Sequence, residues 1–200
     1  MTVEEVFSAL EEKFGAKRES LDKWSVTAVV SATYLHNAAQ FLKDSAGVKF
    51  EMLVDIAGID YLTYPNHEGP RFAVSYSFKS ISNPGMRIRL KVLVSEASLQ
   101  VPTICDLYAN ADWYEREVFD QFGIVFTGHP DLRRLLNHVE LVGHPLRKDY
   151  PAQKRQWLST NDYLLPTLEK RLEELGYRVL QRSKEVETND NEFLEGSVKA

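Results

Sequence analysis

The stretch that decides the fold is RFAVSYSFKSISNPGMRIRLKVLV, residues 71–94. Apolar and polar side chains alternate over 72–79 and again over 86–94, and alternation with a period of two places each set on its own face of a strand. A connection containing Pro84 and Gly85 separates the two runs. We therefore expect two neighbouring antiparallel strands, with one face in a core and the other in water.

Upstream, the apolar spacing predicts an amphipathic helix over 3–14 that ends at Gly15. A β-branched run predicts a strand over 23–31, helical spacing follows over 34–47, and a further strand is expected over 48–56. Strands mixed with amphipathic helices indicate an α+β fold, in which an antiparallel or mixed sheet carries helices packed on one face.

Downstream, residues 97–123 are expected to be helical and to stop at Gly123. A short helix is predicted to begin at Pro166 and end at Gly176, and GYRVL (176–180) is a candidate strand. The polar end of the chain, 182–200, is expected to be flexible. We predict a domain over 1–151 and a C-terminal extension over 152–200, partly helical with a flexible end.

Composition excludes several classes of protein. With 44% hydrophobic and 26% charged residues the chain has an ordinary globular mix, and its net charge of -5 argues against a nucleic-acid binder. The single cysteine, Cys105, excludes an internal disulfide framework and a cluster held by several thiolates of this chain. We find neither a secretory signal nor an apolar run of ~20 residues, so membrane association is expected only through partners.

The segment DWYEREVFDQF, residues 112–122, concentrates charge on a predicted helix. Asp112, Arg116 and Asp120 follow one another at i, i+4 and i+8, which predicts an arginine between two acids on one face, and Glu115 and Glu117 add a second cluster. A carboxylate pair for acid–base chemistry is one interpretation. The neighbouring aromatic residues favour the other, a structural or interface network.

The segment GHPDLRRLL, residues 128–136, predicts a turn at Gly128, His129 near the N-cap and a helix that starts at Pro130. On that helix the leucines and Val139 would face the core, and Arg133 and Arg134 would face outward. The later loop over 143–151 is expected to expose His144, Arg147 and Lys148. It either grips an acidic partner or pairs locally as a solvated loop.

Two other chemistries are weaker. A metal site would recruit His129, Asp131, His138 and His144, but their spacing matches no established metal motif. Cys105 lies between apolar neighbours and is expected to be a small buried hydrophobe rather than a reactive thiolate. The chain also contains no nucleotide-binding fingerprint that we recognise.

The run WYEREVFDQFGIVFTGHPDLRRLL, residues 113–136, closely resembles the signature of the 30 kDa subunit family of respiratory complex I. GHPLRKDYP, residues 143–151, resembles the closing segment of that family. The resemblance implies a non-catalytic structural subunit of the peripheral arm, on the cytoplasmic side of the bacterial inner membrane. It would pack against the 49 kDa-type subunit near the quinone site and contact neighbouring peripheral-arm subunits.

The resemblance further implies that this chain holds no cofactor, since flavin, iron–sulfur clusters and quinone lie in partner subunits. No residue is assigned a catalytic or metal-binding role. The residues expected to hold the turn and the subunit interface are Glu115, Arg116, Glu117, Asp120, Gly123, Gly128, His129, Pro130, Arg133, Arg134, Arg147 and Lys148. The alternatives are the equivalent subunit or domain of a membrane-bound hydrogenase and, less favoured, a free-standing metal hydrolase.

Overall fold

A computed structural model describes residues 2–19, 26–44, 48–152, 156 and 159–177. The chain forms two compact units, one made of residues 1–139 and 143–150 and the other of residues 140–142 and 151–200. The domain boundary expected at residue 151 stays a prediction.

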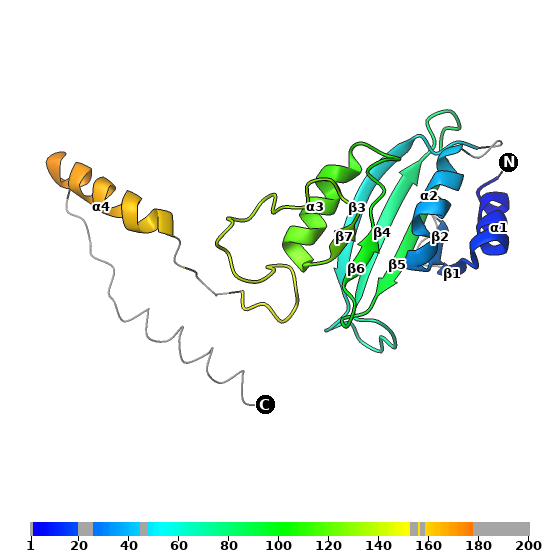
Figure 1. The fold of residues 1–200 in the computed structure, drawn as a ribbon, viewed down its shortest axis with the longest axis horizontal. Coiled ribbons are helices and arrows are strands. Elements are labelled where there is room, and N and C mark those ends of the chain that lie inside the picture. Colours follow the sequence, from blue (N-terminus) through cyan, green and yellow to red (C-terminus); the bar gives the residue numbers. More distant parts are fainter. Residues whose placement is uncertain (1, 20–25, 45–47, 153–155, 157–158, 178–200) are drawn as a thin grey trace. The chain divides into compact units, whose positions relative to one another are not determined.

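The first unit is built on a five-stranded mixed sheet (Figure 1). The strand order is β1-β2-β5-β4-β3, in which β2 and β5 are parallel and the other neighbours antiparallel. The pairing of residues 72–79 with 87–94 confirms the antiparallel neighbours expected from the alternation. The bounds are β1 Lys17–Glu19, β2 Val26–Val30, β3 Met52–Asp60, β4 Phe72–Lys79 and β5 Arg87–Val94.

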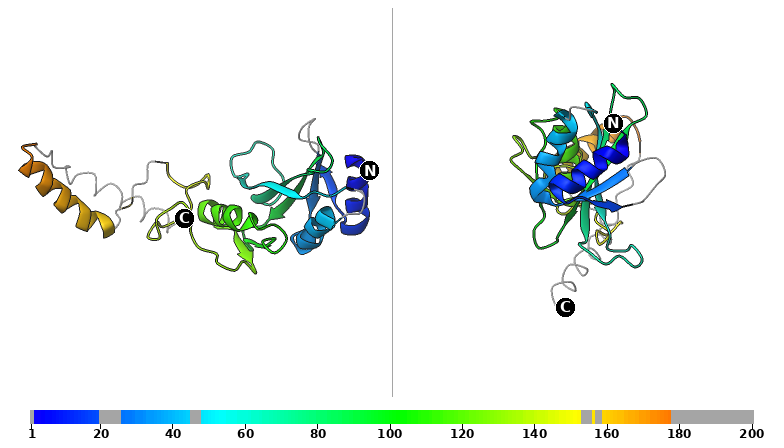
Figure 2. Two further views of the ribbon diagram at one scale, coloured as in Figure 1. Left: turned by 90° about the horizontal axis from the view of Figure 1, so that it is seen from above. Right: turned by 90° about the vertical axis from the view of Figure 1, so that its right-hand side faces the viewer.

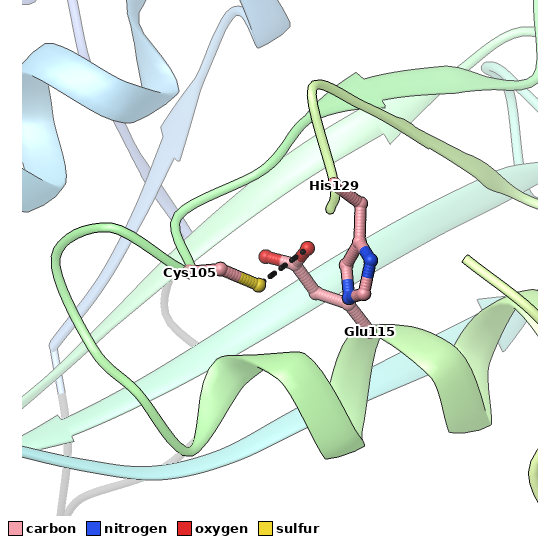
Figure 3. A group of neighbouring side chains, drawn as sticks. All are labelled: Cys105, Glu115 and His129. Carbon is pink, nitrogen blue, oxygen red and sulfur yellow. Dashed lines mark hydrogen bonds between the residues drawn. The ribbon is translucent and has the colours of Figure 1, made fainter. Parts of the chain in front are cut away.

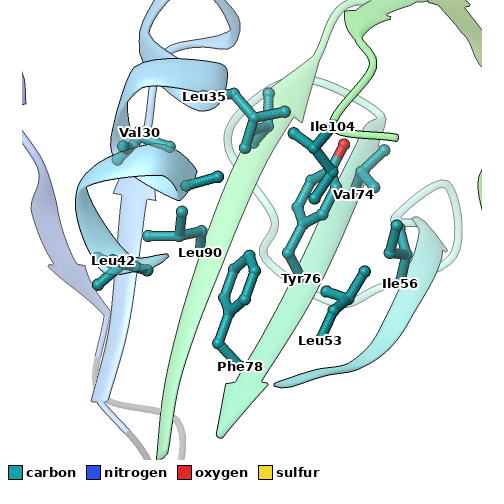
Figure 4. Packing of buried hydrophobic residues seen from close by; sticks show 14 of the residues in the cluster. Val30, Leu35, Leu42, Leu53, Ile56, Val74, Tyr76, Phe78, Leu90 and Ile104 are labelled. Carbon is teal, nitrogen blue, oxygen red and sulfur yellow. The ribbon is translucent and has the colours of Figure 1, made fainter. Parts of the chain in front are cut away.

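One face of this sheet carries the apolar core. Tyr76 lies opposite Leu90 and Phe78 opposite Ile88, and all four side chains are buried (Figure 4). The expectation of a wet opposite face holds only in part. Lys91 is buried there because its ammonium pairs with Glu19 at 2.7 Å, and an amine is rarely buried without such a partner.

Helices cover the apolar face, as expected for an α+β fold. Helix α1 (Val3–Phe14) begins at a Thr2–Glu5 capping box, ends at Gly15 and lies against β2. The short 3₁₀ turn η1 (Ala32–Tyr34) leads into α2 (Leu35–Asp44), and α2 and α3 (Ala111–Phe122) lie on the same side of the sheet (Figure 2).

Helix α3 approaches β3 closely at Gly58. A Cβ atom there would lie 2.5 Å from Cδ2 of Phe122, so only glycine allows the helix to pack at this distance. This contact places the acidic segment of α3 next to the sheet.

Two predicted elements are displaced. The strand expected over 48–56 spans 52–60 instead, with a register shift between Leu53 and Asp55. The helix expected over 97–123 is wrong before residue 111. Residues Gln100–Pro102 form β6, which pairs in parallel with β7 (Val125–Thr127) and so satisfies backbone groups that a helix would have used internally.

The second unit contains α4, Ser159–Glu174. The predicted start at Pro166 is wrong, because this proline lies inside the helix; the expected end near Gly176 is correct, with a positive φ of 80°. Part of the candidate strand, 178–180, and the predicted flexible end, 182–200, fall outside the described residues. Across the described part of the chain, we find no helix with the length and apolar character needed to traverse a bilayer.

Candidate functional site

The charged segment of α3 is followed by Gly123, β7 and then two irregular stretches, residues 128–139 and 143–150, which we call the strap. The helix expected to start at Pro130 is wrong, since residues 130–139 form turns and bends. Gly128 does make the expected turn, with φ 86°. The strap therefore needs a source of order other than its own backbone hydrogen bonds.

That source is two side chains of α3. The carboxylate of Asp120 accepts hydrogen bonds from the backbone N–H groups of Leu135, Leu136 and Asn137 at 3.2, 2.9 and 2.8 Å. Arg116 donates to the carbonyl oxygens of Arg133 and Arg134 at 3.2 and 3.3 Å. These backbone groups would have built the predicted helix, so α3 captures the strap in an irregular conformation.

Asp120 is also the acid of a buried ion pair. Its Oδ1 atom lies 2.7 Å from Nη1 of Arg134, and its side chain has no exposed surface. Burial opposes ionisation, but the backbone N–H of Asn137 and the Arg134 guanidinium outweigh it and lower the pKa of Asp120 to about 2. Asp120 therefore carries its charge into the protein interior at neutral pH.

Asp112, Arg116 and Asp120 lie on α3 at the predicted helical spacing, but no ion pair among the described residues joins Arg116 to either acid. Arg116 uses the strap carbonyls and lies over the ring of Trp113, 5.1 Å from its centroid. The predicted outward pair of arginines is half wrong. The Arg134 side chain is 17% exposed and faces Asp120, whereas that of Arg133 is 71% exposed and, among the ion pairs of the described residues, pairs only with Asp131.

A second buried carboxylate, that of Glu115, lies nearer the N-terminal end of α3. Glu115 is fully buried, and its carboxylate accepts from the Ile104 N–H at 2.9 Å and the Thr103 hydroxyl at 2.5 Å. It also accepts from the Cys105 thiol at 3.4 Å, the contact that Figure 3 shows. Burial raises the pKa of Glu115, and burial likewise raises the pKa of Cys105 to about 12. Such a thiol stays protonated, in agreement with the inert cysteine expected from sequence. Glu117, by contrast, is exposed.

Cys105, Glu115 and His129 are the potential metal ligands that come together in the described residues, with ligand atoms within 4.8 Å of one another. Of the four residues that the sequence suggested as metal ligands, only His129 belongs to this group. Each of the three already has a protein partner. Nδ1 of His129 accepts from the Asp131 N–H at 3.1 Å, which leaves Nε2–H to donate to the Asp112 carbonyl at 3.3 Å. The Cys105 thiol bonds to Glu115, whereas His129 bonds to the backbone of Asp112 and Asp131.

The second part of the strap covers the C-terminal end of α3. Nδ1 of His144 donates to the Asp120 carbonyl at 3.0 Å, and Nε of Arg147 donates to the Phe122 carbonyl at 2.6 Å. A Cβ at Gly123, whose φ is 75°, would lie 2.5 Å from His144. The expected exposed basic loop is thus wrong for His144 and Arg147, which are half-buried, and correct for Lys148.

Burial lowers the pKa of His144, and the nearby Arg147 and Arg134 charges add to this effect. A neutral imidazole is consistent with its place against the helix end, between two guanidinium groups.

Nothing in the sequence indicated a third buried carboxylate, that of Asp60, which pairs with Arg71. We call this pair and its partners the hub. Asp60 has a fully buried side chain and accepts from Arg71 Nε and Nη2 at 3.0 Å each and from the Lys148 N–H at 2.9 Å. Burial opposes its ionisation, but these donors lower the pKa of Asp60 to about 2. Arg71 also pairs with Glu96 and Asp149. The hub therefore fastens the end of the strap to the sheet.

Three apolar side chains of the strap are exposed, alongside several charged ones. Leu136 is 65% exposed, Val139 82% and Leu146 52%, and Trp113 of α3 is also exposed. The predicted inward direction of Leu136 and Val139 is wrong, because the backbone beside them faces Asp120. Apolar side chains exposed in this way are candidates for contact with a partner protein.

The fold and site together define an α+β domain in which buried carboxylates fix an irregular strap with exposed apolar side chains. The chain belongs to the family described as the respiratory-chain NADH dehydrogenase 30 Kd subunit, whose family model matches residues 28–156. The resemblance seen in residues 113–151 is thereby confirmed.

Sequence relatives agree. The C subunits of NADH-quinone oxidoreductase from Burkholderia mallei (strain SAVP1) and from Burkholderia pseudomallei (strain K96243) are each 42% identical over 155 residues, which covers 75% of this chain and 77% of theirs.

Solved structures show the same fold. The trypsin-resistant fragment (1-134) of Nqo5 matches with a TM-score of 0.60 and 37% identity, covering 66% of this chain and 100% of that one. A chain of the membrane-bound sulfane sulfur reductase, an archaeal respiratory membrane complex, matches with a TM-score of 0.60 and 23% identity, covering 90% of this chain and 95% of that one.

Proposed function

We propose that this chain is a non-catalytic structural subunit of proton-translocating NADH-quinone oxidoreductase. It belongs to the peripheral arm on the cytoplasmic side of the bacterial inner membrane and packs against the 49 kDa-type subunit near the quinone site. Flavin, iron–sulfur clusters and quinone are held by partner subunits. Family membership and the relatives from NADH-quinone oxidoreductase support the complex to which we assign the chain.

The strap is the observation that carries the structural role. Four charged side chains of the signature form hydrogen bonds with backbone and side-chain groups of this same chain. They are Glu115, Arg116, Asp120 and Arg134. Groups that fix a loop are positioned for stability rather than for turnover of a substrate. The exposed side chains of the strap include Leu136, Val139 and the guanidinium of Arg133.

This surface defines the chemistry of its partner. Large apolar side chains near an arginine and a tryptophan are typical of the central residues of protein interfaces. The partner would bury Leu136 and Val139 in an apolar depression. A carboxylate of the partner would pair with Arg133 in place of Asp131, to which Arg133 is bound here. We assign this complementary surface to the 49 kDa-type subunit.

Site-specific photo-cross-linking tests the assignment. A photoreactive side chain at Val139, in a strain that assembles the complex from this chain, should give an adduct with the 49 kDa-type subunit. Ile81 is the matched control, because it is also strongly exposed but lies in the connection between β4 and β5. Equal adducts at both positions, or an adduct at Val139 to an unrelated protein, would overturn the assignment.

The absence of a catalytic role has its own test. The purified chain should show no flavin or iron–sulfur absorbance and no NADH oxidation. Stoichiometric cofactor or turnover by the chain alone would contradict the proposal.

A further inference from the structure

The buried carboxylates of the first unit differ in their counter-charge. Asp120 pairs with Arg134 at 2.7 Å, and Asp60 pairs with Arg71 at 3.0 Å. Glu115 is just as deeply buried, but it takes part in none of the ion pairs among the described residues. A buried carboxylate is normally paired with a cation or bound to a metal ion. Glu115 therefore lacks the positive partner that the other two acids have.

The side chains beside Glu115 are metal-binding types. The Sγ atom of Cys105, a carboxylate oxygen of Glu115 and a ring nitrogen of His129 all lie within 4.8 Å of one another (Figure 3). They come from the turn after β6, from α3 and from the start of the strap. Calcium and magnesium prefer oxygen ligands, whereas a thiolate, an imidazole and a carboxylate together suit zinc.

The distances within this group suit a tetrahedral zinc ion. Zinc bonds are ~2.0–2.3 Å long, so neighbouring ligand atoms lie ~3.3–3.8 Å apart around the ion. Sγ of Cys105 lies 3.4 Å from Oε2 of Glu115, which is already such a separation. Ligand atoms as far apart as 4.8 Å would have to approach by about 1 Å.

Asp112 can supply a fourth ligand, although it lies outside the group of three. Its Oδ1 atom is buried, has no hydrogen-bond partner among the described residues and lies 3.4 Å from Nε2 of His129. The side chain as a whole is 38% exposed, so it has room to turn toward the other ligands. Four protein ligands are typical of a structural zinc site, whereas catalytic sites keep one position open.

Binding would exchange two of the existing hydrogen bonds for bonds to the metal. Burial raises the pKa of the free Cys105 thiol, but a metal ion deprotonates a coordinated thiol outright, and the proton leaves to solvent. Whichever ring nitrogen of His129 coordinates, Nδ1 can no longer accept from the Asp131 N–H. Asp131 is exposed, so water can accept that hydrogen bond instead.

We propose that the first unit binds one structural zinc ion through Cys105, Glu115 and His129. Asp112 completes the coordination. The ion provides the counter-charge of Glu115 and joins the start of the strap to α3 and to the turn after β6. This inference goes beyond the proposed function and does not depend on it. Zinc transfers no electrons, so it is not one of the redox cofactors that we assign to partner subunits.

Metal analysis and cobalt spectroscopy of the purified full-length chain test the site. After incubation with zinc and removal of loosely held metal, the wild type should retain one zinc ion per chain in plasma mass spectrometry. Cobalt in place of zinc should give a thiolate-to-cobalt charge-transfer band. This band reports on Cys105 alone, because the chain has no other cysteine.

Two variants separate this site from loose binding at the surface. Cys105→Ser replaces the thiolate with a hydroxyl, so it should abolish the band and weaken zinc binding at least about tenfold. His36→Gln is the matched control, because His36 lies 2.8 Å from Asp106 and offers an imidazole and a carboxylate outside the proposed site. It should bind zinc like wild type. Circular dichroism should show that both variants keep the wild-type fold.

Three results would overturn the zinc site. They are the absence of the charge-transfer band in the wild type, wild-type zinc affinity in Cys105→Ser, and loss of zinc from His36→Gln. None of them bears on the proposed function. That proposal would fail instead if the wild-type chain did not co-purify with the quinone reductase.

Discussion

The sheet and the strap keep their shapes by opposite means. In β4 and β5, stability is spread over a continuous backbone ladder and rows of buried side chains such as Tyr76 and Leu90. In the strap, order is concentrated in a few side chains of α3, above all Asp120 and Arg116. Most apolar side chains of β4 and β5 are buried, whereas the strap exposes several of its own. One domain can thus separate the groups that hold a surface from those to which we assign binding.

Asp120→Ala should give the largest effect on this comparison. The substitution leaves three backbone N–H groups without their acceptor and removes the carboxylate that pairs with Arg134, and breaking a buried pair costs about 3–5 kcal/mol. Urea unfolding should show this loss, and amide exchange should be fastest at Leu135, Leu136 and Asn137. Glu117→Ala, an exposed acid of the same helix, should change stability by less than about 0.5 kcal/mol. Unchanged exchange in Asp120→Ala would show that another group orders the strap.

Leu90→Ala should be the counterpart in the sheet. Truncating this fully buried side chain opposite Tyr76 should cost about 3 kcal/mol, through lost burial and the cavity left behind. Amide exchange should then accelerate across β4 and β5 rather than in the strap. A loss of protection confined to residues 133–137 would contradict the separation between the two regions.

Acid should weaken the carboxylate hubs before it weakens the apolar core. The pKa values of Asp60 and Asp120 are lowered from 3.8 to about 2, so each contributes about 2 kcal/mol that is present above pH 5 and lost as the pH falls toward 2. Asp60→Asn should therefore lower stability at pH 7 and flatten its decline between pH 5 and pH 3. Glu51, whose pKa is also lowered to about 2 but which does not touch the strap, offers a comparison through Glu51→Gln. An unaltered acid slope in Asp60→Asn would refute the assigned pKa.

The same contrast explains what the sequence could predict. Alternation over 72–94 predicted β4 and β5 because burial on one face of a strand repeats every second residue. Periodicity could not predict the strap. Its leucines at 132, 135 and 136 have the spacing of a helix face, but the N–H groups of Leu135 and Leu136 bond to Asp120, which is distant in sequence. The hub of Asp60 and Arg71 was missed because the predicted strand ended at 56, four residues early. The family resemblance suggested candidate interface residues, but it did not tell Arg133, which is exposed, from Arg134, which faces Asp120.

We propose a division of roles in which Asp120 and its partners hold the strap while Leu136 and Val139 bind the partner subunit. It is tested most directly by Leu136→Glu with Val139→Glu, measured for unfolding free energy and for co-purification with the quinone reductase complex. Because both side chains are exposed, stability should change by less than about 0.5 kcal/mol, while recovery of the chain in the complex should fall strongly. A stable variant that assembles and supports NADH-quinone activity like wild type would contradict the account.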